Sequence, residues 1–279
     1  MTTIGLLHPG EMGSAVGASA RADGARVLWA AEGRGVATRG RAAAAGLEDA
    51  GMLGDLVGRS DAIVSVCPPD AAVDLARAVA AHRFAGVYVD ANAVAPATAR
   101  AIGEIVEKAG ATFVDGGIIG GPPQTRGTTR LYLSGAAAAR VAALFARGPL
   151  EAVVVPGGPG AASAVKVAYA AWTKGHAALL MAVRALAIAE GVDDVLVAEW
   201  KLSQPDLATR SESAVQRNTR KAWRFVGEME EIAATFATAG LPDGFHEAAA
   251  EIYRRLAPWK DAQTPPSAAE ACGALAKRR

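Results

Sequence analysis

The first half of the chain alternates short apolar segments with helix-length segments, and this alternation restricts the fold more than any other feature. The apolar segments are residues 3–7, 26–30, 62–66, 86–90, 112–115, 131–134 and 152–155. Strands separated by helices in this way predict a doubly wound parallel sheet, with a mixed edge left open. Ligands bind such sheets beyond the carboxyl ends of the strands, and several of these segments run into polar or glycine-rich residues. We therefore expect a Rossmann-like α/β domain with a binding site along that edge.

The first apolar segment leads into a turn with the features of a pyrophosphate site. The turn and the start of the following helical pattern comprise His8, Pro9, Gly10, Glu11, Met12 and Gly13. Gly10 permits close approach of the backbone to phosphates, Gly13 permits the helix to pack on the strand, and the helix dipole attracts the anion. His8 stands where the G-x-G-x-x-G fingerprint has its first glycine, so a purely structural turn is the alternative.

The residues after the second and third apolar segments bear on the choice of cofactor. An acidic residue after the second strand, here Glu32, accepts a hydrogen bond from the ribose 2′-hydroxyl of NAD, whereas Arg34 and Arg39 are suited to the 2′-phosphate of NADP. We expect NADP in preference to NAD, with ordinary surface arginines as the alternative interpretation. The third segment is followed, at the same edge, by the expected cofactor contacts Cys67, Pro68 and Pro69.

Residues 157–191 predict one long helix after a Gly/Pro turn. Some thirty residues contain no proline, their small and apolar residues recur at helical spacing, and only Gly175 interrupts them. At about 1.5 Å per residue the helix spans on the order of 45 Å, so it joins domains or builds an interface. Lys166 lies on it among Ala and Val; its ammonium group either reaches solvent or is a partly desolvated amine suited to acid–base chemistry. The pattern stays helical beyond it, which predicts an all-α domain over residues 158–279 after an α/β domain over residues 1–157.

Charge and cysteine content exclude several classes of function. The 279 residues carry a formal net charge of +1 and no basic run with interleaved aromatics, so no nucleic-acid partner is expected. Cys67 and Cys272 lack metal-ligand spacing and fit a reducing cytosol, so we expect no metal and a cytoplasmic location. The N-terminus lacks a signal-peptide pattern, and no uninterrupted apolar run reaches membrane-spanning length, so no membrane partner is expected.

Four patches occur in an order typical of one enzyme family. They are residues 8–13, residues 90–96 (DANAVAP), residues 113–121 (FVDGGIIGG) and residues 160–166 (GAASAVK). Together they resemble the β-hydroxyacid dehydrogenase family, which is related to 6-phosphogluconate dehydrogenase, over most of residues 1–175. The C-terminal third is similar to a variant helical domain of the same superfamily.

The resemblance implies hydride transfer between NAD(P) and a small β-hydroxy acid, β-hydroxy amino acid or sugar acid. Lys166 matches the family's catalytic lysine, which exchanges the hydroxyl proton; Asn92 and Tyr169 are expected beside it. The implied substrate-binding residues are Asn92, Gly117, Ile118, Ile119, Gly120, Lys166 and Tyr169. The glycines after the strand at 112–115 are expected to turn backbone N–H groups toward a carboxylate or the nicotinamide. Because family members commonly dimerise through the helical domain, a homodimer is also expected.

The sequence departs from the family at three places. Asn92 stands where the family usually has Ser or Thr, and Tyr169 and Ala170 stand where it has an asparagine pair. Arg126 and Arg130, in the extended third motif, either pair with a substrate anion or are solvated loop arginines. Two other functions therefore stay open. One is imine reduction, although relatives with that activity generally lack the lysine; the other is dinucleotide binding without turnover, as in a sensor.

Overall fold

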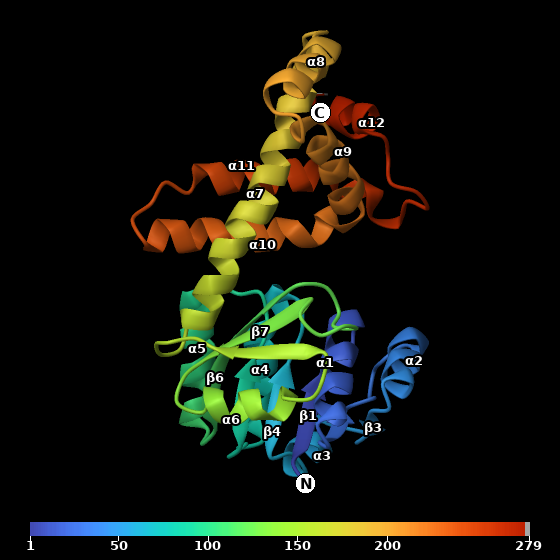
Figure 1. Cartoon of the computed structure of the whole chain (residues 1–279). Coiled ribbons are helices and arrows are strands. Elements are labelled where there is room, and N and C mark those ends of the chain that lie inside the picture. Colours follow the sequence, from blue (N-terminus) through green and yellow to red (C-terminus); the bar gives the residue numbers. More distant parts are fainter. Residues whose placement is uncertain (277–279) are drawn as a thin grey trace. The chain divides into compact units, whose positions relative to one another are not determined.

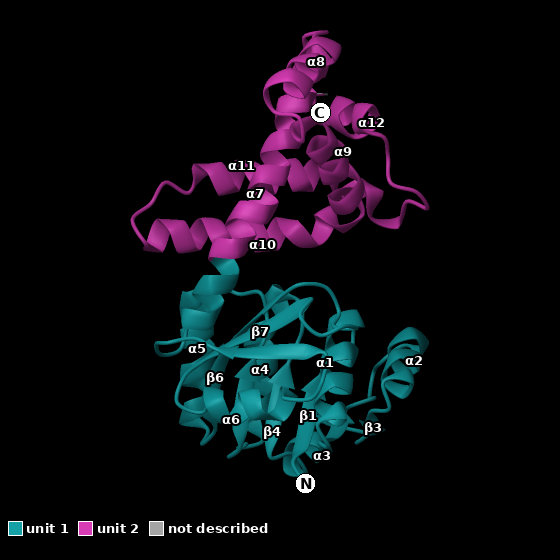
Figure 2. Ribbon diagram, viewed as in Figure 1, with its two compact units in different colours: residues 1–167 teal, residues 168–279 magenta. Residues whose placement is uncertain are grey.

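The computed structural model describes residues 1–276 and divides the chain into two compact units, Met1–Val167 and Ala168 onward (Figure 2). The division lies inside the long helix α7, Ala161–Ala189, ten residues after the boundary expected at residue 157. The difference arises because the N-terminal end of α7 is hydrogen-bonded to the sheet of the first unit, as described below. The last three residues of the expected helical domain lie outside the described residues.

The first unit contains an eight-stranded sheet of order β3-β2-β1-β4-β5-β6-β7-β8 (Figure 1). The strands are β1 Thr3–Leu7, β2 Arg26–Trp29, β3 Glu48–Asp49, β4 Ala62–Ser65, β5 Val87–Asp90, β6 Thr112–Ile119, β7 Thr129–Ser134 and β8 Leu150–Val154. All neighbouring strands are parallel except β6 and β7, which are antiparallel. The predicted Rossmann-like sheet with a mixed edge is confirmed. The two-residue β3 was not predicted, because it is short and polar.

Helices cover both faces of this sheet, since alternate strand residues point to opposite faces. The helices are α1 Glu11–Ala22, α2 Val36–Ala44, α3 Leu53–Gly58, α4 Ala72–Ala81, α5 Pro96–Lys108 and α6 Ala138–Ala142. Val27 of β2 belongs to a core with Val16 of α1, whereas the next residue, Leu28, belongs to a second core with Ile102 of α5. Burial on both faces explains the nearly continuous apolar character of the central strands.

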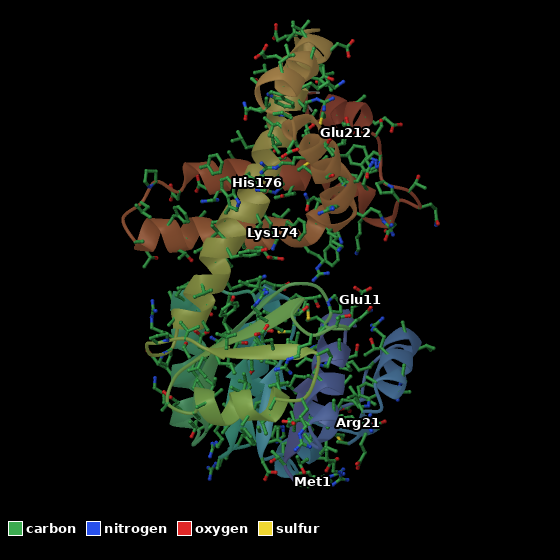
Figure 3. The ribbon with its side chains drawn as sticks, viewed as in Figure 1. Met1, Glu11, Arg21, Lys174, His176 and Glu212 are labelled. Carbon is green, nitrogen blue, oxygen red and sulfur yellow. The ribbon has the colours of Figure 1, made fainter. Side chains whose placement is uncertain are left out.

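The second unit is helical, as predicted. It comprises the rest of α7 with α8 Asp193–Ser203, α9 Leu207–Asn218, α10 Ala222–Thr238, α11 Gly244–Leu256 and α12 Ala268–Ala276. Helices α10 and α11 lie side by side (Figure 1). Lys174 of α7, labelled in Figure 3, forms an ion pair with Glu228 of α10, and the Tyr253 hydroxyl of α11 donates to the Lys174 carbonyl at 2.8 Å. Within residues 1–276, no helix has the length and apolar character needed to cross a membrane.

Candidate active site

The turn between β1 and α1 has the geometry of an anion site. Gly10 is the N-cap of α1, whose first residue, Glu11, is labelled in Figure 3, and no side chain of residues 1–276 caps this helix. A Cβ on Gly13 would lie 2.3 Å from the His8 carbonyl oxygen, so only glycine permits α1 to approach the turn this closely. A Cβ on Gly10 would meet nothing within 4 Å, which leaves open space beside the backbone. Uncapped N–H groups at the positive end of a helix dipole bind phosphate.

A cavity of about 180 Å³ lies beside this turn, at the carboxyl ends of β1 and β2. His8, Glu32 and Arg34 contribute its polar lining, and Leu53 and Leu75 are among its apolar lining residues. Arg39 does not line it: its guanidinium donates to the carbonyl oxygens of Ala31 and Arg34 at 2.8 and 3.1 Å and thereby orders the loop after β2. Cationic, acidic and apolar groups beside an uncapped helix fit the adenosine end of a nicotinamide dinucleotide.

His8 adopts a left-handed backbone conformation with φ 65°, the region that favours glycine. Its Nδ1 atom is buried and has no hydrogen-bond partner within residues 1–276. Burial, with the positive charge of Arg34, lowers the pKa of His8 to about 4. The imidazole is therefore neutral at neutral pH.

Asn92 joins the ends of two strands rather than projecting into open space. Its carbonyl oxygen accepts from the backbone N–H of Cys67 at 2.6 Å, and its amide nitrogen donates to Ser65 Oγ at 3.0 Å and to Asp90 Oδ1. Both amide donors are thus directed at protein atoms, and the side chain is buried. These contacts do not support the expectation that Asn92 offers an N–H group to the substrate. The hydrogen bond to Asn92 fixes the backbone of Cys67, and the chain continues through Pro68 and Pro69 to the start of α4.

Asp90 is fully buried at the end of β5. Burial and the charge of the neighbouring Asp115 raise the pKa of Asp90 to about 8. The carboxyl group is therefore largely protonated at neutral pH, and the neutral form is the one that burial favours.

Asp115 holds the N-terminus of α7 against the sheet. Its Oδ2 accepts from the backbone N–H groups of Gly160 and Ser163 at 2.9 and 3.0 Å and from Ser134 Oγ at 3.0 Å, and its Oδ1 accepts from Ser163 Oγ at 2.5 Å. The N–H of Ala162 donates in turn to Ser134 Oγ at 3.1 Å. A carboxylate at this end satisfies the exposed N–H groups and complements the helix dipole. The N-terminus of α7 is therefore capped by side chains of the first unit, whereas no side chain of residues 1–276 caps that of α1.

The hydrogen bonds of Asp115 with the start of α7 hold Lys166, three residues after Ser163, at the carboxyl edge of the sheet. A Cβ on Gly117 would lie 2.9 Å from both the Ala162 carbonyl oxygen and Lys166 Cβ, so glycine lets α7 lie directly on β6. Lys166 is half-buried at this contact. The expectation of a glycine-rich loop here was wrong for Gly117, Ile118 and Ile119: they continue β6 and pair with β7, whereas the pairing of β5 with β6 ends at Asp115. Gly120, with φ 120°, is where the chain turns.

Other residues considered from the sequence lie elsewhere. Tyr169, three residues after Lys166 in α7, is 50% exposed. Arg126 donates to the carbonyl oxygen of Ala146, and Arg130 to that of Gly127. No group of three or more His, Cys, Asp or Glu side chains within residues 1–276 is placed to hold a metal ion.

Comparison with known families identifies the first unit. Residues 2–146 match the NAD binding domain of 6-phosphogluconate dehydrogenase. The chain belongs to this family. Residues 187–256 match a second family, described as a domain of unknown function, DUF1932. An uncharacterised 28.5 kDa protein of Methanothermus fervidus is 30% identical over 195 residues, which are 70% of this chain and 74% of that protein.

Solved structures with the same fold include hydroxyacid dehydrogenases. A conserved protein of unknown function, described as structurally similar to 3-hydroxyacid dehydrogenases, is 26% identical with a TM-score of 0.70 over 91% of this chain and 96% of its own. The 3-hydroxyisobutyrate dehydrogenase of Mycobacterium tuberculosis is 18% identical with a TM-score of 0.72 over 99% of this chain and 100% of its own. Imine reductases and reductive aminases align with TM-scores of 0.53 to 0.57. Solved structures that share this fold thus include dehydrogenases and reductases, among them a reductive aminase in complex with NADPH and an imine reductase in complex with NAD+.

Proposed function

We propose that this protein is an NAD(P)-dependent oxidoreductase that transfers hydride between the cofactor and a small β-hydroxy acid, with Lys166 as the general acid and base. The observation that carries the proposal is the contact of Lys166, on α7, with Gly117 near the end of β6, at the carboxyl edge of the sheet, where Asp115 holds the start of α7. The same edge carries the uncapped N-terminus of α1. In doubly wound sheets this edge is where dinucleotides and their substrates bind.

Different residues of the chain bind the cofactor, transfer the proton and position the site in this proposal. The N-terminus of α1 and the turn from His8 to Gly13 bind the pyrophosphate, and Glu32 and Arg34 face the adenosine ribose. The bound nicotinamide supplies the hydride acceptor or donor. Lys166 removes the proton of the substrate hydroxyl during oxidation and returns it during reduction, and proton transfer of this kind contributes about 10²–10⁴-fold to the rate. Asn92 and Asp115 do not touch the substrate in this scheme; they fix the strand ends and the helix.

NADP is the proposed preferred cofactor. Arg34 lines the cavity at the end of β2, where a guanidinium group can bind the 2′-phosphate through two hydrogen bonds. Glu32 lies in the same lining, and a ribose 2′-hydroxyl paired with it makes NAD the alternative.

The test measures cofactor binding and turnover separately. Fluorescence titration with NADPH and NADH gives each Kd, and a panel of 3-hydroxy acids then gives kcat/KM for the wild type, Lys166→Met and Lys108→Met. Lys108 is an exposed lysine of α5 and serves as the matched control. We expect kcat/KM to fall at least about a hundredfold in Lys166→Met alone, with each Kd unchanged. Turnover that survives in Lys166→Met would refute the assigned role, and absence of binding of either cofactor would refute the proposal as a whole.

Imine reduction is the second candidate, and the occurrence of imine reductases on this fold favours it. The choice of substrate in the assay distinguishes imine reduction from hydroxy acid oxidation. Cyclic imines offered with NADPH would be reduced at a rate that Lys166→Met leaves unaltered. Binding of NADPH without turnover of either class would favour a sensor instead.

We also propose that the protein acts as a homodimer formed through α7. The side chains of Tyr169, Trp172, His176, Leu179, Val183 and Leu186 recur at alternating intervals of three and four residues along this helix. That spacing is the 3.5-residue repeat of two helices packed together. Trp172, Leu179 and Leu186 are 65%, 48% and 64% exposed, so this stripe (the α7 stripe) lacks a partner among residues 168–276 of the second unit. A second copy is the proposed partner, because a two-fold axis across the stripe buries it on both copies.

The proposed location is the cytoplasm. Both cysteines, Cys67 and Cys272, are free thiols, and burial raises the pKa of each to about 11. Free thiols that form no disulfide are typical of proteins of reducing compartments. Fractionation of cells that produce the protein checks this directly, and recovery outside the cytoplasmic fraction would contradict it.

A further inference from the structure

The residue that interrupts the glycine fingerprint occupies the cofactor cavity. His8 has the left-handed backbone conformation that the position demands, so the turn keeps its shape although glycine is absent. Histidine is one of the few residues other than glycine that adopts this conformation with any frequency. The consequence is an imidazole in the lining of the cavity, beside Arg34.

The charged groups around His8 come from two elements. Arg34 and Glu32, on the loop after β2, share the cavity lining with it, and Arg34 is close enough for its charge to act on the imidazole. Arg41 of α2 holds the adjoining Pro9 carbonyl through its Nε, at 3.3 Å. The other walls, from α3 and α4, are apolar at Leu53 and Leu75. Although Glu32 shares the lining, burial and the positive charge of Arg34 lower the pKa of the imidazole and keep it neutral before a ligand binds.

A phosphate group bound to Arg34 reverses this balance. At pH 7 such a group carries a charge of about −1.5 to −2, which exceeds the single charge of one arginine. The remaining negative charge favours the protonated imidazole, and the added proton gives His8 a second N–H donor. The proton comes from solvent, and no covalent bond changes.

We propose that His8 reads the 2′-phosphate of the cofactor by proton uptake: binding of NADP protonates the imidazole, which then pairs with the phosphate alongside Arg34, whereas binding of NAD does not. This inference rests on the proposed function, since it requires that the cavity accept a dinucleotide. It assigns to His8 a role in specificity that a glycine at the same position lacks.

Calorimetric titration measures the proton directly. NADP and NAD are each titrated into the protein at pH 7.5, in two buffers of different ionisation enthalpy, and the difference between buffers gives the number of protons bound. We expect net uptake for wild type with NADP and none with NAD. His8→Asn retains a polar side chain that tolerates the left-handed backbone, and His8→Gly retains the turn without a side chain. In both variants the uptake with NADP should disappear.

The pH dependence of affinity is the second measurement. One bound proton changes affinity by at most about tenfold per pH unit. From pH 8 to pH 7 the preference for NADP over NAD should rise at least about threefold in wild type and stay level in both variants. The chain has four histidines, so the nitrogen NMR signals of His8 can be assigned by comparison with His8→Asn and followed on addition of NADP.

Three outcomes overturn the inference. Equal proton uptake with NAD and NADP, uptake that persists in His8→Asn and His8→Gly, or an imidazole that stays neutral with NADP bound would each remove His8 from phosphate recognition while leaving dinucleotide binding intact. Failure of wild type to bind either dinucleotide would instead refute the proposed function, and the inference with it.

Discussion

The hydroxyl oxygen of Ser163 lies 2.5 Å from Oδ1 of Asp115, and this contact joins the helix that bears Lys166 to the strand on which Lys166 rests. Asp115 also accepts two backbone N–H groups from the same helix end and the hydroxyl of Ser134. A buried carboxylate with four donors is a rigid anchor. The position of the proposed catalytic lysine thus depends on a residue that does not itself take part in proton transfer.

Replacement of Asp115 tests the anchor. Asp115→Ala leaves buried donors of Gly160, Ser163 and Ser134 without an acceptor, and unpaired buried donors cost about 1–3 kcal/mol each. We expect the free energy of unfolding of the first unit to fall by at least about 3 kcal/mol. Urea denaturation followed by near-UV circular dichroism measures it. Ser163→Ala removes only one hydroxyl and should lower the free energy of unfolding by about 1–1.5 kcal/mol. Equal losses in Asp115→Ala and Ser163→Ala would contradict the role of Asp115 as the anchor.

Gly117 is expected to control the position of Lys166 rather than stability alone. In Gly117→Ala the new Cβ would lie 2.9 Å from Lys166 Cβ and from the Ala162 carbonyl oxygen, so α7 must shift away from β6. A displacement of about 1 Å at a reacting group costs about a hundredfold in rate. We expect kcat to fall by about that factor while the Kd for NADPH is unchanged. Gly121→Ala is the control, since a Cβ there meets nothing within 4 Å; a matching loss of kcat in it would contradict the assignment.

Features of the fold that depend on neighbouring residues were predicted from the sequence, whereas features that depend on residues far apart in the chain were not. The strand–turn–helix unit around Gly10 and Gly13 was predicted, because its residues are adjacent and the period of the apolar residues identifies each element. The extension of β6 through Gly117 was not, because two consecutive glycines usually mark a loop and only pairing with β7 holds them as a strand. The partners of Asp115 were also missed. They lie up to 48 residues away, and no local pattern in the sequence joins an aspartate to a helix start at that distance.

The two glycines of the first turn should respond differently to alanine. Gly13→Ala places Cβ 2.3 Å from the His8 carbonyl oxygen, so the packing of α1 on the turn is lost and the melting temperature falls. Gly10→Ala meets no protein atom within 4 Å, so stability should change little while the Kd for NADPH rises, because the methyl group occupies space proposed for the pyrophosphate. Thermal unfolding and fluorescence titration separate the two effects. Unchanged cofactor affinity in Gly10→Ala would show that the phosphates lie elsewhere.

Asp90 predicts a pH dependence of stability. Its pKa is raised from the ordinary value of 3.8 to about 8, so between these values the folded protein keeps a proton that the unfolded chain releases. Stability from this group is therefore present at low pH and lost as the pH rises through about 8. Asp90→Asn removes this dependence, so its stability relative to wild type should improve from pH 5 to pH 8. Urea denaturation at several pH values measures the trend. Asp74→Asn, at a side chain 81% exposed, should show no such trend, and a parallel pH profile for Asp90→Asn and wild type would contradict the prediction.

Dimer formation through the α7 stripe predicts a change of mass. Leu179→Lys puts a charge in the middle of an apolar seam, where an unpaired ammonium group is costly to bury, so the dimer should dissociate. Leu202→Lys makes the same substitution on α8, at a side chain that is 82% exposed and outside the stripe, and should leave association unchanged. Sedimentation equilibrium at micromolar concentration should give twice the chain mass of 28.3 kDa for wild type and Leu202→Lys, and the single mass for Leu179→Lys. Circular dichroism of both variants checks that the helices remain. Trp172 lies in the stripe, so loss of the dimer should expose its side chain further and shift the tryptophan fluorescence to longer wavelength. A monomer mass for the wild type would contradict the proposal that a second copy covers this surface.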